Sequence, residues 1–118
     1  MTLKPDTPHP VLWLYIAQAR LGLQTAITNL EATGIKSTEW PYPIIEMFLG
    51  RRTEQATVEA AGSLGEQLCE AQFFIAELLL LREKHTDAIG GLRSAVDTCS
   101  KASIILPSAK AELKRITR

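Results

Sequence analysis

The segment from Glu66 to Arg82 restricts the possible folds of this chain more than any other stretch of it. Apolar side chains recur there at the three- and four-residue spacing of a helix and cover most of its circumference: Leu68, Ala71, Phe74, Ile75, Leu78, Leu79 and Leu81. A helix that is apolar on most sides is buried on more than one side. We therefore expect this helix to be the central element of the fold, with other helices packed around it.

Shorter segments with the same helical spacing occupy most of the remaining chain. The expected helices cover residues 12–21, 23–32, 43–49, 54–61, 87–99 and 104–116. Convincing alternation of apolar and polar residues at period two, which would indicate strands, is absent. At 118 residues the chain has the length of one domain. The sequence thus predicts a single all-α domain over residues 1–118, built from about six to seven helices in antiparallel hairpins.

Two prolines precede a short apolar segment in the stretch EWPYPIIEMFLG, residues 39–50. Proline fits the first position of a helix because the N–H that it lacks would have no helical partner there. We expect Pro43 at that position, with Pro41 holding Trp40 in an extended conformation. Trp40 and Tyr42 are expected to pack over the helix, and an exposed aromatic binding feature is the alternative.

Charge and hydropathy argue against two classes of partner. Thirteen Lys and Arg residues balance thirteen Asp and Glu residues, so no overall field would gather nucleic acid or an anionic membrane. The apolar run at residues 11–17 is too short for a membrane span or a signal peptide. We expect no nucleic-acid partner, no membrane span and a cytoplasmic location, with a periplasmic location as the alternative if a signal sequence has been removed.

The final stretch of the sequence, KAELKRITR, is rich in basic residues, with Lys110, Lys114, Arg115 and Arg118. Cations near a helix C-terminus complement the helix dipole, and neither interleaved aromatic residues nor a nucleic-acid recognition motif accompanies them. We therefore expect these side chains to be solvated, with contact to nucleic acid or acidic lipid as the less favoured alternative.

No residue pattern in the sequence points to catalysis. A nucleophile elbow, a P-loop, a Gly-rich dinucleotide turn and an HExxH motif are all absent, and neither His9 nor His85 stands beside a nucleophile motif. We expect no enzyme activity, no cofactor and no metal. A small-molecule site near Trp13, Trp40 and Tyr42 would need an enclosed cavity lined by converging polar groups.

The segment CEAQFFIAELLLLREKHTDAIGGLRSAVDTCS, residues 69–100, resembles a tetratricopeptide repeat. Ala76 matches the small residue that lets the second helix of such a repeat approach the first. The small, large, small series of the second helix is matched by Ala88, Leu92 and Ala95. The segment departs from the family at three positions, where Trp, Gly and Pro are usual: Gln72, Glu83 and Ser100.

Two adjacent glycines, Gly90 and Gly91, lie within the second helix of this segment. Each lowers helix propensity by roughly 1 kcal/mol relative to Ala. Because glycines are usually kept in a helix where another backbone comes close, we expect close packing at this pair.

The order of elements extends the resemblance over most of the chain. The stretches WPYPIIEMFLG and GEQLCEAQFFIAELLLL together are similar to bacterial tetratricopeptide proteins of the helical lipoprotein type. The resemblance implies hairpins stacked as in an α-solenoid, with a capping helix at about residues 104–117. It also implies a scaffold that binds a peptide or a protein.

The resemblance places four residues on the groove side of the first helix of this repeat: Glu70, Phe73, Glu77 and Leu80. Spacings of three and four residues put them on one helix face. Members of the family that clamp a peptide C-terminus use Lys and Asn there, so Phe73 and Glu77 imply an apolar or basic partner instead. One alternative is that Phe73 and Leu80 belong to the core and are covered by the last helix or by a second subunit. The alternative function is that of a self-assembling homodimer subunit whose apolar faces are used in association, so that no groove remains free.

The same resemblance brings the two cysteines, Cys69 and Cys99, close together, because the first helix of such a hairpin begins beside the end of the second. A disulfide between them would stabilise the fold by roughly 3–4 kcal/mol. In the cytosol both would stay reduced and act as small buried apolar residues. Two thiols without a nearby pair of histidines do not form a zinc site.

Overall fold

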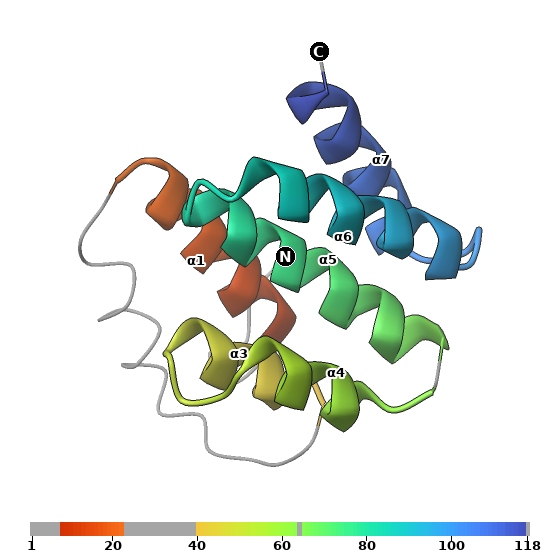
Figure 1. The fold of residues 1–118 in the computed structure, drawn as a ribbon. Helices are drawn as coiled ribbons and strands as arrows, with labels where there is room; N and C mark the ends of the chain where they lie inside the picture. The colour runs from red at the N-terminus through yellow and green to blue at the C-terminus, as the bar shows by residue number, and fades with distance from the viewer. Residues whose placement is uncertain (1–7, 23–39, 64, 118) are drawn as a thin grey trace. The chain divides into compact units, whose positions relative to one another are not determined.

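The computed structural model of the protein describes residues 8–22, 40–63 and 65–117. Within these ranges every regular element is a helix and no strand occurs, which confirms the predicted all-α class (Figure 1). The elements are α1 (Pro8–Arg20), α3 (Tyr42–Phe48), α4 (Glu54–Ala61), α5 (Gly65–Leu81), α6 (His85–Thr98) and α7 (Ile105–Ile116). The helix predicted over residues 23–32 lies outside the described residues. Contacts divide the chain into two compact units, Met1–Thr53 and Glu54–Arg118.

In the first unit, α1 contacts α3, and aromatic side chains take part in that contact. Tyr15 and Ile16 are buried on one face of α1. The ring of Tyr15 lies against that of Phe48, with the two centroids 4.9 Å apart. Leu14 and Leu21 are exposed. The sequence predicts one apolar face for this helix, formed by residues at helical spacing: Leu12, Trp13, Ile16, Ala17 and Leu21. Ala17 and Leu21 are exposed, so only part of that face is buried.

The start of α3 lies one residue before the predicted one. The helix begins at Tyr42, so Pro43 is its second residue, where the missing N–H again has no helical partner. The N–H of Ile44 donates to the carbonyl of Pro41 at 2.9 Å. The Trp40–Pro41 peptide bond is cis.

Gly50 ends α3 through a left-handed backbone conformation, with a φ of 78°. Its N–H donates to the carbonyl of Met47 at 3.0 Å, and the N–H of Arg51 donates to the carbonyl of Glu46 at 2.8 Å. These are the two bonds of a Schellman motif, which gives partners to carbonyls at the helix end. Glycine is favoured at this position because a side chain would be strained there.

In the second unit, α5 is the central helix, as predicted, because it contacts α4, α6 and α7. Its buried apolar residues point in several directions: Cys69, Ala71, Phe73, Phe74, Ala76 and Leu78. The bounds of α4 are those predicted from the sequence. An ion pair between Arg82 Nη1 and Glu54 Oε1, 3.1 Å apart, joins α4 to the end of α5. Such exposed pairs contribute little stability.

α6 runs antiparallel to α5 and comes close to it at Gly91 (Figure 1). A Cβ placed on Gly91 would lie 3.2 Å from the Cβ of Ala76, which is tighter than ordinary contact. A Cβ placed on Gly90 would meet nothing within 4 Å. Only Gly91 of the glycine pair therefore provides the close approach. The small, large, small series on α6 is fully buried: Ala88, Leu92 and Ala95.

The turn from α5 to α6 places Glu83 in the left-handed conformation, with a φ of 60°. The N–H of Glu83 donates to the carbonyl of Leu80 at 3.0 Å, and the N–H of Lys84 donates to that of Leu79 at 2.8 Å. Glycine adopts this conformation at helix ends without the steric cost that a side chain incurs. Glu83 stands where the tetratricopeptide pattern has glycine, so it keeps the turn geometry at the cost of backbone strain.

α7 begins at Ile105, so Pro107 is its third residue and belongs to the first turn, whose N–H groups have no helical partners. Ser103 Oγ accepts a hydrogen bond from the N–H of Ile105 at 3.1 Å and so provides a partner for one of these groups. The helix packs mainly against α6. Its buried apolar residues are Ile105, Leu106 and Ala109.

Candidate protein-binding site

The four residues that the resemblance assigns to partner binding lie on α5, and three of them are buried. The exposed fractions are 8% for Glu70, 1% for Phe73 and 2% for Glu77, whereas Leu80 is half-buried. The ring of Phe73 also packs edge-on against that of Phe74, with the centroids 5.2 Å apart. A partner could reach the three buried side chains only after the atoms that cover them had moved away.

The two cysteines lie where the α5–α6 hairpin closes. Cys69 belongs to the start of α5, and Cys99 directly follows the last residue of α6. Their Cα atoms are 4.9 Å apart and their sulfur atoms are joined in a disulfide. Both residues are buried. The disulfide therefore joins the start of the first helix of the hairpin to the end of the second.

A small polar cluster lies beside the disulfide. Ser103 Oγ donates a hydrogen bond to Glu66 Oε1 at 2.8 Å and lies 3.6 Å from Cys69 Sγ. The same oxygen accepts the N–H of Ile105. Because one hydroxyl bonds to the start of α5 and to the start of α7, the cluster holds these two helix ends together.

The outward side of α7 combines exposed apolar and basic side chains. We name five exposed residues the α7 surface: Ile104, Pro107, Lys110, Ala111 and Lys114. Three- and four-residue spacings place all five on one side of the helix: Ile104, Pro107, Ala111 and Lys114 form a row, and Lys110 lies beside it. The sequence predicts that the lysines are solvated, but it does not single out Ile104 as an exposed apolar residue. In the structure Ile104 is 73% exposed. A helical projection that begins at Ile104 would have found the same row.

The aromatic residues that a small-molecule site would use belong to the first unit. Trp13, Trp40 and Tyr42 are each half-buried. The Nε1 of Trp40 is itself buried, and no acceptor among the described residues forms a hydrogen bond with it. This degree of burial agrees better with packing over α3 than with an exposed aromatic binding feature.

The described parts of the chain contain neither a group of metal ligands nor a membrane-spanning helix. There, no three His, Cys, Asp or Glu side chains are grouped so that they could hold a metal ion. None of the helices in these ranges has both the length and the apolar character needed to cross a bilayer.

No protein-family model matches the chain. No solved structure matches it either. A functional assignment therefore depends on the geometry of the helices.

Proposed function

We propose that the protein is a protein-interaction module of the tetratricopeptide type, without catalytic activity, that holds a peptide or a protein on its helical surface. The observation that carries this proposal is the α5–α6 hairpin. Its two antiparallel helices meet at small residues, Gly91 and Ala76, and the left-handed turn residue Glu83 connects them. Helix-turn-helix units of this kind form the repeats of tetratricopeptide scaffolds.

The position of α7 supports the same proposal. The period of the tetratricopeptide family is about 34 residues. One such period after Gln72, Ile75 and Leu79 the chain has Leu106, Ala109 and Leu113. These three residues lie on the side of α7 that is buried or half-buried. In this reading α7 is the first helix of a following repeat and also caps the hairpin.

The partner-binding surface of this module is open to a direct test. A photo-crosslinking amino acid at exposed positions of three different helices, Gln55, Ser94 and Ala111, would trap partners in living cells. A protein trapped at any of these positions should also bind the purified chain, with a measurable affinity in calorimetry. If none of the positions traps a protein that binds in this way, the interaction function is wrong.

A second candidate function is self-assembly as a homodimer, and the exposed side of α1 favours it. Leu14 and Leu21 are 56% and 77% exposed, and the exposed Ala17 lies between them in a row of helical spacing. An apolar row without charges is suited to pairing with a copy of itself. Light scattering over a concentration series should then show a dimer that Leu14→Glu converts to a monomer. A wild-type monomer at every concentration would exclude self-assembly.

The disulfide supports an oxidising location for this function. Structural disulfides persist in compartments such as the periplasm and are rare in the cytosol. Cys69 and Cys99 are joined in the structure, which favours the periplasmic alternative over the cytoplasmic one. Trapping free thiols with an alkylating reagent at the moment of cell lysis, followed by mass spectrometry, would decide between the two locations.

A further inference from the structure

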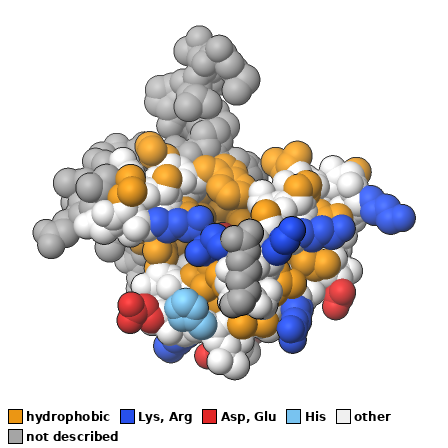
Figure 2. All heavy atoms as spheres, turned by 90° about the horizontal axis from the view of Figure 1, so that it is seen from above, with side chains coloured by type: hydrophobic (Ala, Val, Ile, Leu, Met, Phe, Trp, Pro, Cys, Tyr) orange, Lys and Arg blue, Asp and Glu red, His pale blue; other side chains and the backbone are white. Residues whose placement is uncertain are grey.

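The α7 surface joins one large exposed aliphatic side chain to two exposed lysines. Ile104 lies at the start of the row, Pro107 and Ala111 continue it, and Lys110 and Lys114 lie along its second half. Figure 2 views the molecule from the side toward which α7 ends, and on that face Lys and Arg side chains lie beside hydrophobic ones. The buried apolar side of α7 faces the other way, so the surface is not required for packing.

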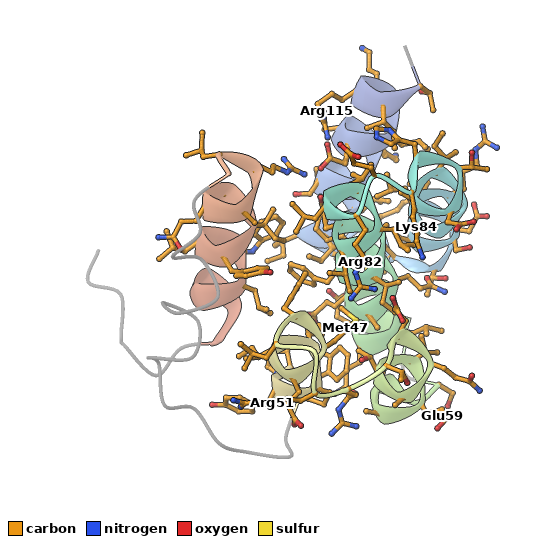
Figure 3. The ribbon with its side chains drawn as sticks, turned by 60° about the vertical axis from the view of Figure 1, so that its left-hand side comes forward. Met47, Arg51, Glu59, Arg82, Lys84 and Arg115 are labelled. Carbon is orange, nitrogen blue, oxygen red and sulfur yellow. A yellow bond between two sulfur atoms is a disulfide. The ribbon has the colours of Figure 1, made fainter. Side chains whose placement is uncertain are left out.

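The exposed charge of α7 is entirely positive. Glu112 is the only acidic residue of the helix, and it is 6% exposed and paired with Arg115, which is labelled in Figure 3. Lys110 and Lys114 have no ion-pair partner among the described side chains. A partner that approaches this surface therefore meets two lysines with which no described carboxylate forms an ion pair.

The helix dipole does not account for the whole arrangement. Cations in the last turn of a helix are stabilised by its dipole, but the effect falls off beyond that turn. Lys114 lies in the last turn, whereas Lys110 lies in the middle of α7. The dipole also gives no reason for an isoleucine with 73% of its surface exposed.

Three other occupants fit the surface less well. A second copy of the chain would bring like charges together, which opposes association. A membrane-surface helix needs a broad apolar face toward the lipid, but the broad apolar face of α7 is turned toward α6. Single-stranded nucleic acid is usually held by aromatic side chains, and this row of residues contains none.

We propose that the α7 surface binds an acidic, amphipathic segment of a partner protein. Apolar side chains of that segment contact Ile104, Pro107 and Ala111, and its carboxylates pair with Lys110 and Lys114. This rests on the proposed interaction function and assigns a site and a partner chemistry to it. Charge complementarity at an exposed surface sets specificity and association rate more than affinity, so the complex is expected to weaken as salt is added.

Fluorescence anisotropy with the full chain tests the proposal. The probes are three labelled helical peptides of equal length: one built from Leu and Glu in amphipathic order, one with Lys in place of Glu, and one with Ser in place of Leu. The first should bind the protein, and the second should not. The third should bind more weakly than the first, because it lacks the side chains that would contact Ile104.

Matched variants locate the binding on the protein. Lys110→Glu/Lys114→Glu should weaken binding of the acidic amphipathic peptide about tenfold, equivalent to about 1.4 kcal/mol. The control Lys84→Glu/Arg93→Glu makes the same change in net charge at two other exposed positions. Arg93 lies on α6, and Lys84, which is labelled in Figure 3, directly precedes that helix. It should leave the affinity within about twofold. Ile104→Ser, at a position that does not support the fold, should weaken binding without changing the charge.

The proposal is overturned if the acidic amphipathic peptide does not bind, or if both double variants weaken its binding equally. It is also overturned if vesicles of phosphatidylcholine and phosphatidylserine, or duplex DNA, bind through Lys110 and Lys114 while the peptide does not. These outcomes are separate from a failure of the interaction function itself. If the peptide test fails but a partner is trapped at Gln55 or Ser94, the interaction function still holds. Only the role of the α7 surface in that function is then wrong.

Discussion

The α5–α6 contact and the α7 surface belong to the same unit but place opposite demands on their side chains. At the contact, a Cβ on Gly91 would lie only 3.2 Å from the Cβ of Ala76. At the α7 surface, Ile104 and Lys114 are exposed, and packing restricts neither their size nor their charge. Substitutions at the contact should therefore change the free energy of unfolding, whereas substitutions at the surface should change binding and leave stability nearly unaltered.

The largest effect is expected from removal of the disulfide, which closes the region around the contact. Cys69 and Cys99 are 30 residues apart in the sequence. Loop closure over that length predicts a loss of roughly 3–4 kcal/mol in the free energy of unfolding. Denaturant unfolding of the wild type and of Cys69→Ala/Cys99→Ala would measure it. Reductant should bring the wild type down to the variant, and equal stability of the wild type with and without reductant would contradict the prediction.

The neighbouring glycines provide the next test, because the same substitution should have opposite effects at the two positions. Gly91→Leu forces a side chain against Ala76 and is expected to cost about 1–3 kcal/mol. Gly90→Leu, which meets open space, is expected to gain up to about 1 kcal/mol from helix propensity. Thermal unfolding of both variants compares them directly. A similar change in melting temperature for both would show that the helices do not approach each other at Gly91.

Glu83 tests the turn that joins the two helices of the contact. Glu83→Gly should stabilise the protein by about 1 kcal/mol, because glycine adopts a φ of 60° without strain. The control Glu59→Gly makes the same change on the exposed side of α4 (Figure 3) and should cost about 1 kcal/mol. Denaturant midpoints measure both effects, and a loss of stability in both variants would rule out strain at Glu83.

The smallest effect is expected at Ile104 of the α7 surface, and its buried neighbour Ile105 provides the comparison. Ile104→Ala should change the free energy of unfolding by less than about 0.5 kcal/mol, since the side chain is exposed. Ile105→Ala removes a buried side chain and should cost about 2–5 kcal/mol. Unfolding curves for the two variants separate these values. A large loss at Ile104 would mean that this residue packs against the protein and is not available to a partner.

The approximate positions of the described helices could be predicted from the sequence because each depends on local spacing, although α1 begins four residues and α6 two residues before the predicted start. The apolar residues of α5 recur around its circumference, which identified it as the central helix, and α4 has the predicted bounds. The start of α3 differed by one residue, since Pro43 is tolerated at the second helical position as well as the first. Local patterns of this kind need no knowledge of the neighbouring helices.

The side chains that each helix exposes could not be predicted in the same way. Burial of Glu70 and Glu77 depends on what covers α5, and periodicity along one helix does not contain that information. The rotation of α6 against α5 decides that Gly91, and not Gly90, makes the close contact. The exposure of Ile104 likewise follows from the side of α7 that packs against α6. Predictions for the candidate site were therefore weaker than predictions for the fold.

The covalent closure of the hairpin determines how the chain would respond to a mechanical load. A pulling force applied at the two ends of the chain is transmitted through the Cys69–Cys99 bond and not through the residues between them. The enclosed chain would contribute roughly 100 Å of extension if it were free, at about 3.3–3.6 Å per residue. In the oxidised protein this length stays hidden from the load, so most of α5 and all of α6 remain enclosed when the helices outside the loop have been pulled apart.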